Sequence, residues 1–554
     1  MKNMRKITAL TLALGLMSLS SLSNADIALK KFNTNENILV NNKVAMIKEG
    51  PVQKEEELRA TWVSTVYNLD FPSKPGLSKE DFQKEYLELL DNVEALKLNS
   101  IIFQVRPKGD AFYDSKINPW SDFLTGVEDK SPQWDPLKWM VDETHKRGLE
   151  FQAWFNPYRV TTSYSANTSK EEDLAKLSPR NYARRNPQNV FKYNGKLYLN
   201  PAEPEVISYI NETIMEVVYK YDIDGVHLDD YFYPSRRENI EGFYSWEEAE
   251  SFKKYGQGHS SVSSWRRDNV TSLIARLSSS IRDYNKNNDD AVSFGVSPFG
   301  IWGHKVNHPK GAPEGEGSNT PQGSMESYKY QFVDTRKWIK EGLLDYVAPQ
   351  IYWTFDQKAA PYGELVSWWA DQVAGTDVDL YIGHANYRKA ENKQKNSWAN
   401  PREISNQIKY NNNFEEVKGS IFFRYKSLLK GDNPVNNKFL DILRTEHYSK
   451  LAKLPSRSGD RADYPKTVYD LKMESDLFGN ILTWKDHKDN KSAYYIIYRK
   501  EVGSPSKEAI GKIHRMERQN YQYFVDQNAD PYKKYVYSVS SLDKANRESP
   551  ELSL

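Results

Sequence analysis

The chain of 554 residues contains no cysteine. This absence excludes disulfide scaffolds, thiolate zinc sites, iron–sulfur clusters, cysteine nucleophiles and a lipid-modified N-terminal cysteine. Net charge is almost absent as well, because 76 Lys and Arg residues face 75 Asp and Glu residues. A dedicated nucleic-acid-binding protein would carry a basic domain or stripe, so we expect no nucleic-acid partner.

Long hydrophobic runs are missing beyond the first 25 residues, so we expect a protein that does not span a membrane. At the start, Lys2, Arg5 and Lys6 precede an apolar stretch, and small residues lead up to Ala25. This pattern predicts a signal peptide over residues 1–25, with an uncleaved membrane anchor as the alternative. We therefore expect secretion into a periplasm or the extracellular space, as a soluble protein that is not a lipoprotein.

Hydrophobic residues make up 38% of the chain and charged residues 27%, which is enough for a large core. After a polar lead-in over residues 26–57, residues 58–450 alternate short apolar runs with amphipathic stretches. Eight such runs separated by helices predict an α/β fold, a (β/α)8 TIM-type barrel. A doubly wound open sheet is the alternative, but no glycine-rich phosphate loop follows the first strand. The expected strands are Ala60–Val66, Ser100–Val105, Glu150–Phe155, Gly225–Asp229, Val292–Pro298, Tyr346–Tyr352, Asp379–Gly383 and Ser420–Arg424.

The expected helices carry apolar residues at spacings of three and four. They are Lys79–Leu96, Pro136–Arg147, Glu205–Tyr221, Trp265–Tyr284, Tyr328–Glu341, Leu365–Ala374, Pro401–Asn412 and Asn433–Arg444.

The pattern changes after residue 450. Residues 451–464 are polar and contain proline, serine and glycine, as a linker does, and residues 465–554 hold short alternating strands at about ten-residue intervals. This spacing predicts a small all-β sandwich. Trp484 and the Tyr535–Val539 run resemble a fibronectin type III-like domain. We expect it to support the barrel, or to contact a cell-wall or division-site protein.

The active site of a (β/α)8 barrel lies at the carboxyl ends of its strands. The fourth strand ends in two acids, Asp229 and Asp230. Side-chain alternation directs His227 and Asp229 into the barrel, while Asp230 follows on the turn. Two carboxyl groups with different solvation acquire different pKa values, as an acid and a nucleophile require. We expect Asp229 to be the nucleophile or oxocarbenium stabiliser, Asp230 the acid, and His227 a hydrogen-bonded core residue.

Other polar and aromatic side chains follow the remaining strand ends. We expect them to hydrogen-bond substrate oxygens or to stack on sugar rings, the alternatives being ion pairs with the acids and loop packing. Asp110 and two glutamates of the glycine-rich insert, Glu314 and Glu316, compete with Asp230 for the acid role. The candidates for substrate binding are Arg106, Asp110, Asn156, Arg159, Tyr231, Tyr233, Trp302, Gln350, Tyr352, Trp353, His384 and Arg424.

Five stretches carry a family resemblance: Phe103–Pro107, Trp154–Arg159, Asp224–Pro234, Gly295–Trp302 and Ala348–Trp353. Over roughly residues 58–400 the chain resembles glycosyl hydrolase-like family 10. The resemblance implies a TIM-type barrel that hydrolyses O-glycosyl bonds of a glycan backbone. Within the family the chain looks like a division-site type of enzyme, which acts on peptidoglycan strands stripped of their peptides. The acidic motif of the family falls on Asp229 and Asp230, and we expect no cofactor.

Two other functions remain open. A metal-dependent polysaccharide deacetylase uses an Asp-Asp pair and two histidines four residues apart, a spacing that His304 and His308 share. A non-catalytic protein that binds cell-wall glycan would use the same rim without releasing new reducing ends.

Overall fold

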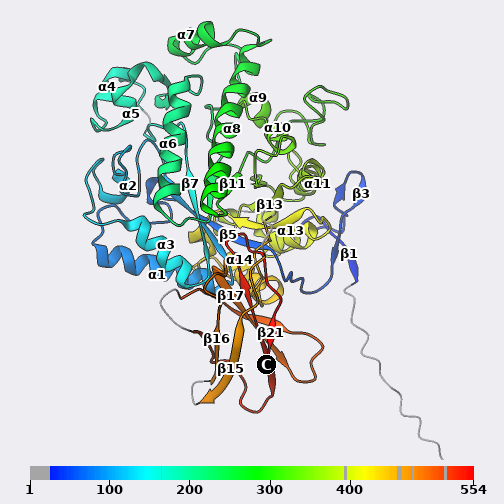
Figure 1. Cartoon of the computed structure of the whole chain (residues 1–554). Coiled ribbons are helices and arrows are strands. Elements are labelled where there is room, and N and C mark those ends of the chain that lie inside the picture. Colours follow the sequence, from blue (N-terminus) through cyan, green and yellow to red (C-terminus); the bar gives the residue numbers. More distant parts are fainter. Residues whose placement is uncertain (1–24, 164, 392–395, 458–463, 477–478, 517–520) are drawn as a thin grey trace, which may run out of the picture.

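The computed structural model describes residues 25–163, 165–391, 396–457, 464–476, 479–516 and 521–554. The predicted signal peptide therefore lies, apart from Ala25, outside the described residues. The barrel itself is confirmed: eight parallel strands close in the order β10-β11-β12-β13-β14-β5-β6-β7 (Figure 1). These strands are β5 (Leu58–Val63), β6 (Ser100–Arg106), β7 (Glu150–Phe155), β10 (Gly225–Leu228), β11 (Ser293–Val296), β12 (Tyr346–Val347), β13 (Asp379–His384) and β14 (Val417–Phe422).

The barrel strands are apolar because they are buried on both faces. All seven residues of β6 are buried, and so are all four of β10. On β10, Val226 and Leu228 belong to the large core shared with the surrounding helices. Their neighbour His227 contacts Trp62 inside the barrel. The predicted alternation on this strand is therefore confirmed.

Helices surround the barrel, and the first of them begins with a capping interaction. Ser78 accepts a hydrogen bond from the main-chain N–H of Asp81, and α1 then buries Phe82, Tyr86 and Leu89 on one face. The major helices are α1 (Lys79–Ala95), α3 (Pro136–Lys146), α6 (Pro204–Lys220), α8 (Val262–Asn288), α10 (Thr335–Lys340), α11 (Tyr362–Val373), α13 (Glu403–Asn411) and α14 (Pro434–Ile442). The shorter ones are α2 (Asp122–Thr125), α4 (Lys170–Ala175), α5 (Tyr182–Arg185), α7 (Trp246–Tyr255), α9 (Ser327–Tyr330) and α12 (Tyr387–Ala390).

The prediction of one helix over Tyr328–Glu341 is wrong. The chain forms α9, leaves the helix, and starts again at α10. Phe332 between them has φ of 59° and is fully buried. Asp334 then caps α10 by accepting from the main-chain N–H of Lys337. Burial of the Phe332 ring and a new N-cap interrupt the helix that the apolar spacing predicts.

The lead-in packs against the barrel. β1 (Asp26–Ala28) pairs antiparallel with β4 (Met46–Lys48), and β2 (Leu39–Val40) pairs with β3 (Lys43–Val44). Their buried apolar residues join the main core, so this segment is more apolar in its contacts than its composition indicates. Those residues are Leu29, Ile38, Val40, Ala45 and Ile47.

The C-terminal part is confirmed as an all-β region of antiparallel sheets. One sheet has the order β15-β16-β19 and the other β18-β17-β20-β21. Trp484 and Tyr495 are fully buried where the sheets pack. The strands are β15 (Tyr469–Asp476), β16 (Gly479–Lys485), β17 (Tyr494–Glu501), β18 (Glu508–His514), β19 (Gln522–Asp526), β20 (Tyr535–Leu542) and β21 (Leu552–Ser553). A separate hairpin, β8 (Val190–Tyr193) and β9 (Lys196–Leu199), lies within the barrel region.

This β region lies against the amino-terminal end of the barrel (Figure 1). Arg457 pairs with Glu150 at the start of β7, and Asn546 donates to the same carboxylate at 2.9 Å. Lys544 pairs with Asp222 and Asp290 at 2.5 and 3.1 Å. Basic side chains of the linker and of the β region thus meet acidic side chains of the barrel.

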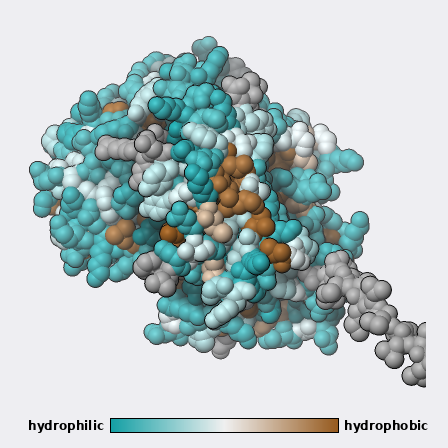
Figure 2. Space-filling view, turned by 60° about the horizontal axis from the view of Figure 1, so that its bottom comes forward, coloured by the Kyte–Doolittle hydropathy of each residue, from teal (hydrophilic) through white to brown (hydrophobic). Residues whose placement is uncertain are grey.

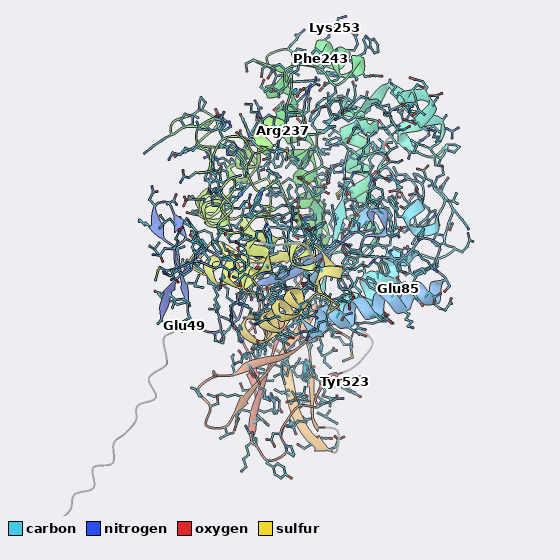
Figure 3. All side chains as sticks on the ribbon, turned by 180° about the vertical axis from the view of Figure 1, so that it is seen from behind. Glu49, Glu85, Arg237, Phe243, Lys253 and Tyr523 are labelled. Atoms are coloured by element: carbon cyan, nitrogen blue, oxygen red, sulfur yellow. The ribbon has the colours of Figure 1, made fainter. Side chains whose placement is uncertain are left out.

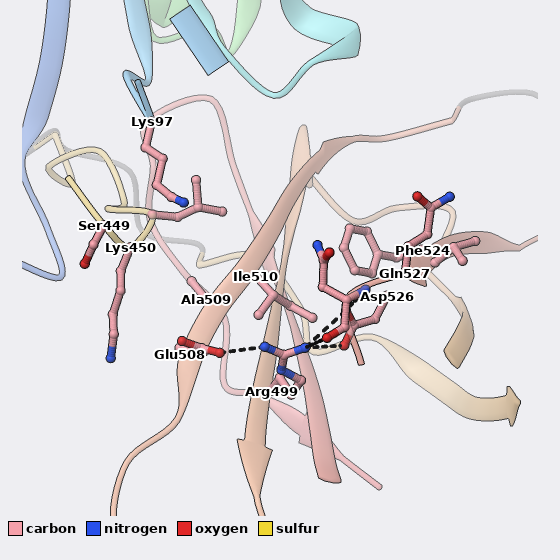
Figure 4. Close-up of a pocket in the computed structure, with 13 residues that line it drawn as sticks. Lys97, Ser449, Lys450, Arg499, Glu508, Ala509, Ile510, Phe524, Asp526 and Gln527 are labelled. Carbon is pink, nitrogen blue, oxygen red and sulfur yellow. Dashed lines mark hydrogen bonds and ion pairs between the residues drawn. The ribbon is translucent and has the colours of Figure 1, made fainter. Parts of the chain in front are cut away.

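The surface of the molecule is mainly polar on the face shown in Figure 2. From behind (Figure 3), Phe243 and Lys253 lie at the end remote from Tyr523 of the β region. The face shown in Figure 2 also has a hydrophobic stripe near its middle and smaller hydrophobic groups elsewhere. A polar cavity of about 270 Å³ lies between the barrel base and the β region (Figure 4). Arg499 in its wall is paired with Glu508 and Asp526.

Candidate active site

Asp229 directly follows β10 and is 4% exposed. Its Oδ2 atom accepts hydrogen bonds from Nδ2 of Asn156 and, at 3.2 Å, from Nε1 of Trp154. Its Oδ1 atom accepts from the main-chain N–H of Tyr231 at 3.1 Å. All three partners are donors, and carboxylates rather than carboxylic acids are stabilised by donors alone.

Asp230 is partly exposed at the same strand end. Nε2 of Gln331 donates to its carboxylate at 3.3 Å and to its main-chain oxygen at 3.1 Å. The Arg159 guanidinium lies 4.1 Å from the ring centre of Tyr231, whose side chain is 53% exposed. Arg159 therefore places a positive charge beside the two acids on a side that solvent reaches.

The acids influence each other's ionisation. Burial, and then the charge of Asp230, raise the pKa of Asp229 to about 7. Burial also raises the pKa of Asp230, against hydrogen bonds from Gln331 and Gln350. Two carboxyl groups this strongly linked titrate as a pair. The donors around Asp229 oppose the rise in its pKa, because they stabilise its carboxylate.

His227 lies below the acids and is fully buried. Nε1 of Trp62 donates to its Nε2 at 3.0 Å, so Nδ1 carries the ring proton and donates to the Tyr346 hydroxyl at 2.8 Å. That hydroxyl donates in turn to Gln152 at 2.6 Å. Burial lowers the pKa of His227 to about 3. The residue is a neutral, hydrogen-bonded part of the barrel interior, as the sequence predicts.

Three aromatic rings lie together after the last strands of the barrel. Tyr352 stacks on Phe423 with ring centres 5.9 Å apart, and Tyr387 meets both rings edge-on. Burial raises the pKa of Tyr352, and the nearby charges of Asp230 and Asp229 add to the rise. Because all three residues are partly exposed, they can present ring surface to a sugar next to the acids.

Two further candidates border this group. Trp353 is partly exposed and packs edge-on against Phe299 at 5.4 Å. Gln350 donates to the main-chain oxygen of Ser297 at 3.0 Å, and its side chain also interacts with Asp230. Both stay candidates for substrate contact.

Three candidates are buried, so the prediction that they face substrate is not supported. Trp302 is fully buried and stacks on Trp368. Tyr233 is 1% exposed and packs against Phe332. His384 is also fully buried, and burial lowers its pKa to about 4. Loop packing, the alternative for the aromatic residues, describes the first two.

The remaining charged candidates are engaged elsewhere. Arg106 is 1% exposed and donates to the main-chain oxygens of Asn156 and Pro157, so it supports the loop after β7. Asp110 is fully buried and pairs with Lys108 at 3.2 Å. Arg424 pairs with Asp70 at 3.1 Å. The contacts of Arg106 and Arg424 thus go to other partners than Asp229. The alternative that either arginine forms an ion pair with Asp229 is therefore wrong.

The two histidines of the deacetylase alternative lie in a separate network. His308 bridges Glu314 at 2.6 Å and Glu326 at 3.3 Å, and the carboxylates raise its pKa against burial. His304 interacts with Thr320 at 2.7 Å. Glu316 pairs with Lys305 at 2.6 Å. Among the described residues, no group of three or more His, Cys, Asp or Glu side chains could hold a metal ion.

Several residues that shape the site escaped the sequence analysis. Trp154 and Gln104 lie within buried strands and look like core residues. Gln331 comes from the break between α9 and α10, 101 residues after Asp230. Tyr387 and Phe423 follow β13 and β14 closely, so the strand ends place both at the rim, but neither was among the candidates for substrate binding.

Comparison with known proteins gives the family. The model of the family described as Glycosyl hydrolase-like 10 matches residues 57–400. The chain belongs to this family. It is 42% identical to "Glycosyl hydrolase YngK" of Bacillus subtilis (strain 168) over 502 residues, 90% of this chain and 92% of that protein. It is 37% identical to "Glycosyl hydrolase DigH" of Escherichia coli (strain K12), over 68% of this chain and 85% of that protein.

This member of the family is a glycoside hydrolase with a TIM-type barrel. Among solved structures it is similar to the spore cortex-lytic enzyme SleL of Bacillus megaterium, with a TM-score of 0.37 and 10% identity over 76% of this chain and 79% of that one. A likeness at this level carries no argument about substrate. None of the helices in the described part of the chain is both long and apolar enough to cross a membrane.

Proposed function

We propose that this glycoside hydrolase is exported and cleaves within the backbone of peptidoglycan glycan strands that lack peptides. The observation that carries the proposal is the pair of adjacent carboxyl groups at the end of β10, one nearly buried among donors and one partly exposed. Glycoside hydrolysis needs two carboxyl groups in different protonation states, and the different environments of the two acids support this assignment.

In the proposed reaction, Asp230 donates its proton to the glycosidic oxygen as the bond to the anomeric carbon breaks. Asp229, ionised and held by its three donors, attacks that carbon or stabilises its positive charge. A water molecule then gives its hydroxyl to the anomeric carbon and its proton to Asp230, and Asp229 leaves the carbon as a free carboxylate. Arg159 limits the rise in pKa of both acids.

The substrate assignment is supported by the predicted signal peptide and by the resemblance to a peptidoglycan-active type of this family. The partly exposed rings of Tyr352, Tyr387 and Phe423 suit a polysaccharide. We further propose a barrel domain over residues 58–450 and a fibronectin type III-like domain over 465–554 that supports it. The ion pairs of Arg457 and Lys544 favour this supporting role.

The test is incubation of the protein, without residues 1–25, with peptide-free peptidoglycan strands, followed by mass spectrometry of the soluble products. Wild type is expected to release short oligosaccharides in the presence of EDTA, and Asp229→Asn and Asp230→Asn are expected to release none. Products that lose acetyl mass only when metal is present would assign the deacetylase reaction instead. Glycan binding without any product would contradict hydrolysis of this substrate.

A further inference from the structure

We propose that Gln104 is a positioning residue that fixes the direction of the Asn156 amide and thereby keeps a donor on Asp229. The inference rests on the proposed role of Asp229 as the ionised partner. Gln104 lies on β6 opposite Trp154 of β7, and Asn156 follows β7 at the carboxyl end of the barrel. The three side chains of the relay, Gln104, Asn156 and Asp229, are 1%, 0% and 4% exposed.

The direction of the Gln104 amide is set by the main chain. Its Oε1 atom accepts from the N–H groups of Thr65 and Val66, both at 2.9 Å, and from the Ser64 hydroxyl at 3.2 Å. A main-chain N–H can only donate, so the oxygen of the amide must face the segment after β5. The Nε2 group therefore faces the opposite way, toward Asn156.

The orientation of the Gln104 amide determines the orientation of the Asn156 amide. Nε2 of Gln104 donates to Oδ1 of Asn156 at 2.6 Å. With its oxygen engaged as the acceptor, Asn156 presents its Nδ2 group to Oδ2 of Asp229. A rotated Asn156 would bring two amide groups donor to donor at Gln104 and place an oxygen against the carboxylate. Through Gln104 and Asn156, the main-chain N–H groups after β5 thus determine that a donor rather than an acceptor faces Asp229.

The polarity matters for the chemistry. A donor at Asp229 favours its carboxylate, whereas an acceptor there favours its protonated form. With Gln104 in place, Asn156 keeps a donor on Asp229, so the relay favours the carboxylate that the proposed reaction requires there. The acid role is left to Asp230, the partly exposed acid. Without Gln104, the Asn156 amide is free to rotate and the pKa of Asp229 rises.

The test measures kcat/KM against pH on peptide-free glycan strands for Gln104→Met, Asn156→Leu and the double variant. Because activity requires ionised Asp229, the acid limb of the profile reports its ionisation. Loss of one donor to a carboxylate is expected to move that limb of Asn156→Leu upward by about 1–2 pH units. Gln104→Met is expected to move it in the same direction, and the double variant no further than Asn156→Leu alone.

Gln152→Met provides the matched control, since Gln152 is a buried barrel glutamine whose side chain contacts Tyr346 rather than Asn156. It is expected to lower Tm without moving the acid limb. Should Gln104→Met fail to fold, Gln104→Glu takes its place in the same double-variant comparison. An acid limb that does not move in the Gln104 variant, or moves equally with and without Asn156, overturns the inference. If Asp229→Asn is fully active, both the proposed function and this inference fail. If Asp229→Asn is inactive but the acid limb does not move in the Gln104 variant, only the inference fails.

Discussion

Asp229 and Asp230 are adjacent in sequence yet occupy different environments. Asp229 is enclosed by donors from β7 and from its own turn, while Asp230 meets the Gln331 amide and solvent. The strand-end position and the alternation of β10 predict the pair from sequence. The donors could not be predicted, because Trp154 and Gln331 become neighbours of the acids only when the barrel closes.

Burial also explains which single residues were misjudged. Trp302 and His384 follow strand ends just as Tyr387 does, so the sequence predicts that all three side chains lie at the rim of the barrel. In the structure, Trp302 stacks on Trp368 and His384 on Phe422, while Tyr387 stays partly exposed. The loops decide this difference, and loop conformation depends on contacts far apart in the chain.

The aromatic group beside Asp230 leads to a prediction about substrate binding. Tyr387→Ala removes a partly exposed ring that meets Tyr352 and Phe423. We expect KM for glycan strands to rise roughly 3- to 10-fold with a smaller change in kcat, because stacking on a sugar stabilises the bound substrate. Steady-state kinetics check this, with Tyr86→Leu as a control whose buried ring contacts Thr144 on the outside of the barrel. A KM that is unchanged in Tyr387→Ala would remove this group from the binding site.

The elements of the barrel were predicted well because each one carries its own signal. Buried runs such as Glu150–Phe155 mark strands to the residue, and the apolar face of α1 marks its helix. The segment Tyr328–Glu341 fails because the apolar spacing continues through Phe332, where the backbone leaves the helix. Spacing reports which side chains are buried, and it does not report a change in backbone direction between them.

The ends of α3 and α10 allow a matched test of how closely the β region approaches the barrel. Gly148 and Gly342 each follow such a helix with a positive φ, 70° and 60°. A Cβ atom at Gly148 would lie 2.3 Å from the main-chain oxygen of Lys512, whereas nothing lies within 4 Å at Gly342. We expect Gly342→Ala to cost about 1 kcal/mol of unfolding free energy through its backbone alone. Gly148→Ala should cost about 2–5 kcal/mol, because the β region must move as well.

Thermal unfolding followed by circular dichroism measures both variants. Equal losses in the two would show that β18 does not press on Gly148, contrary to the described packing.

As a whole, the molecule has the proposed active site at one end of the barrel and the packed β region at the other (Figure 1). Arg457 is 17% exposed in its side chain and pairs with Glu150, which is 3% exposed. Asp224 and Asp345 contribute further charge interactions with this guanidinium. Composition could predict two parts and a polar connection. It could not predict that Arg457, which lies in this connection, pairs with Glu150 at the base of the barrel.

Arg457→Met is expected to lower the unfolding free energy by about 3–5 kcal/mol, because it leaves buried carboxylates without their partner. Lys491→Met is the matched control, since Lys491 pairs with Asp289 across the same junction with side chains 46% and 50% exposed. An exposed pair contributes about 0–1 kcal/mol. Urea unfolding of both variants gives the comparison. If both lose the same small amount, Arg457 does not hold the base together.

The central claim is that Asp229 and Asp230 perform the hydrolysis, and the most direct measurement is kcat on peptide-free glycan strands for Asp229→Asn and Asp230→Asn. Asp345→Asn is the control, because Asp345 is a carboxyl group at the opposite end of the same barrel that accepts from the main-chain N–H of Phe294. We expect both site variants to lose at least about 10²–10⁴-fold in kcat while keeping the wild-type fold, and Asp345→Asn to keep its kcat. A folded Asp229→Asn or Asp230→Asn that turns over within about tenfold of wild type would contradict the claim.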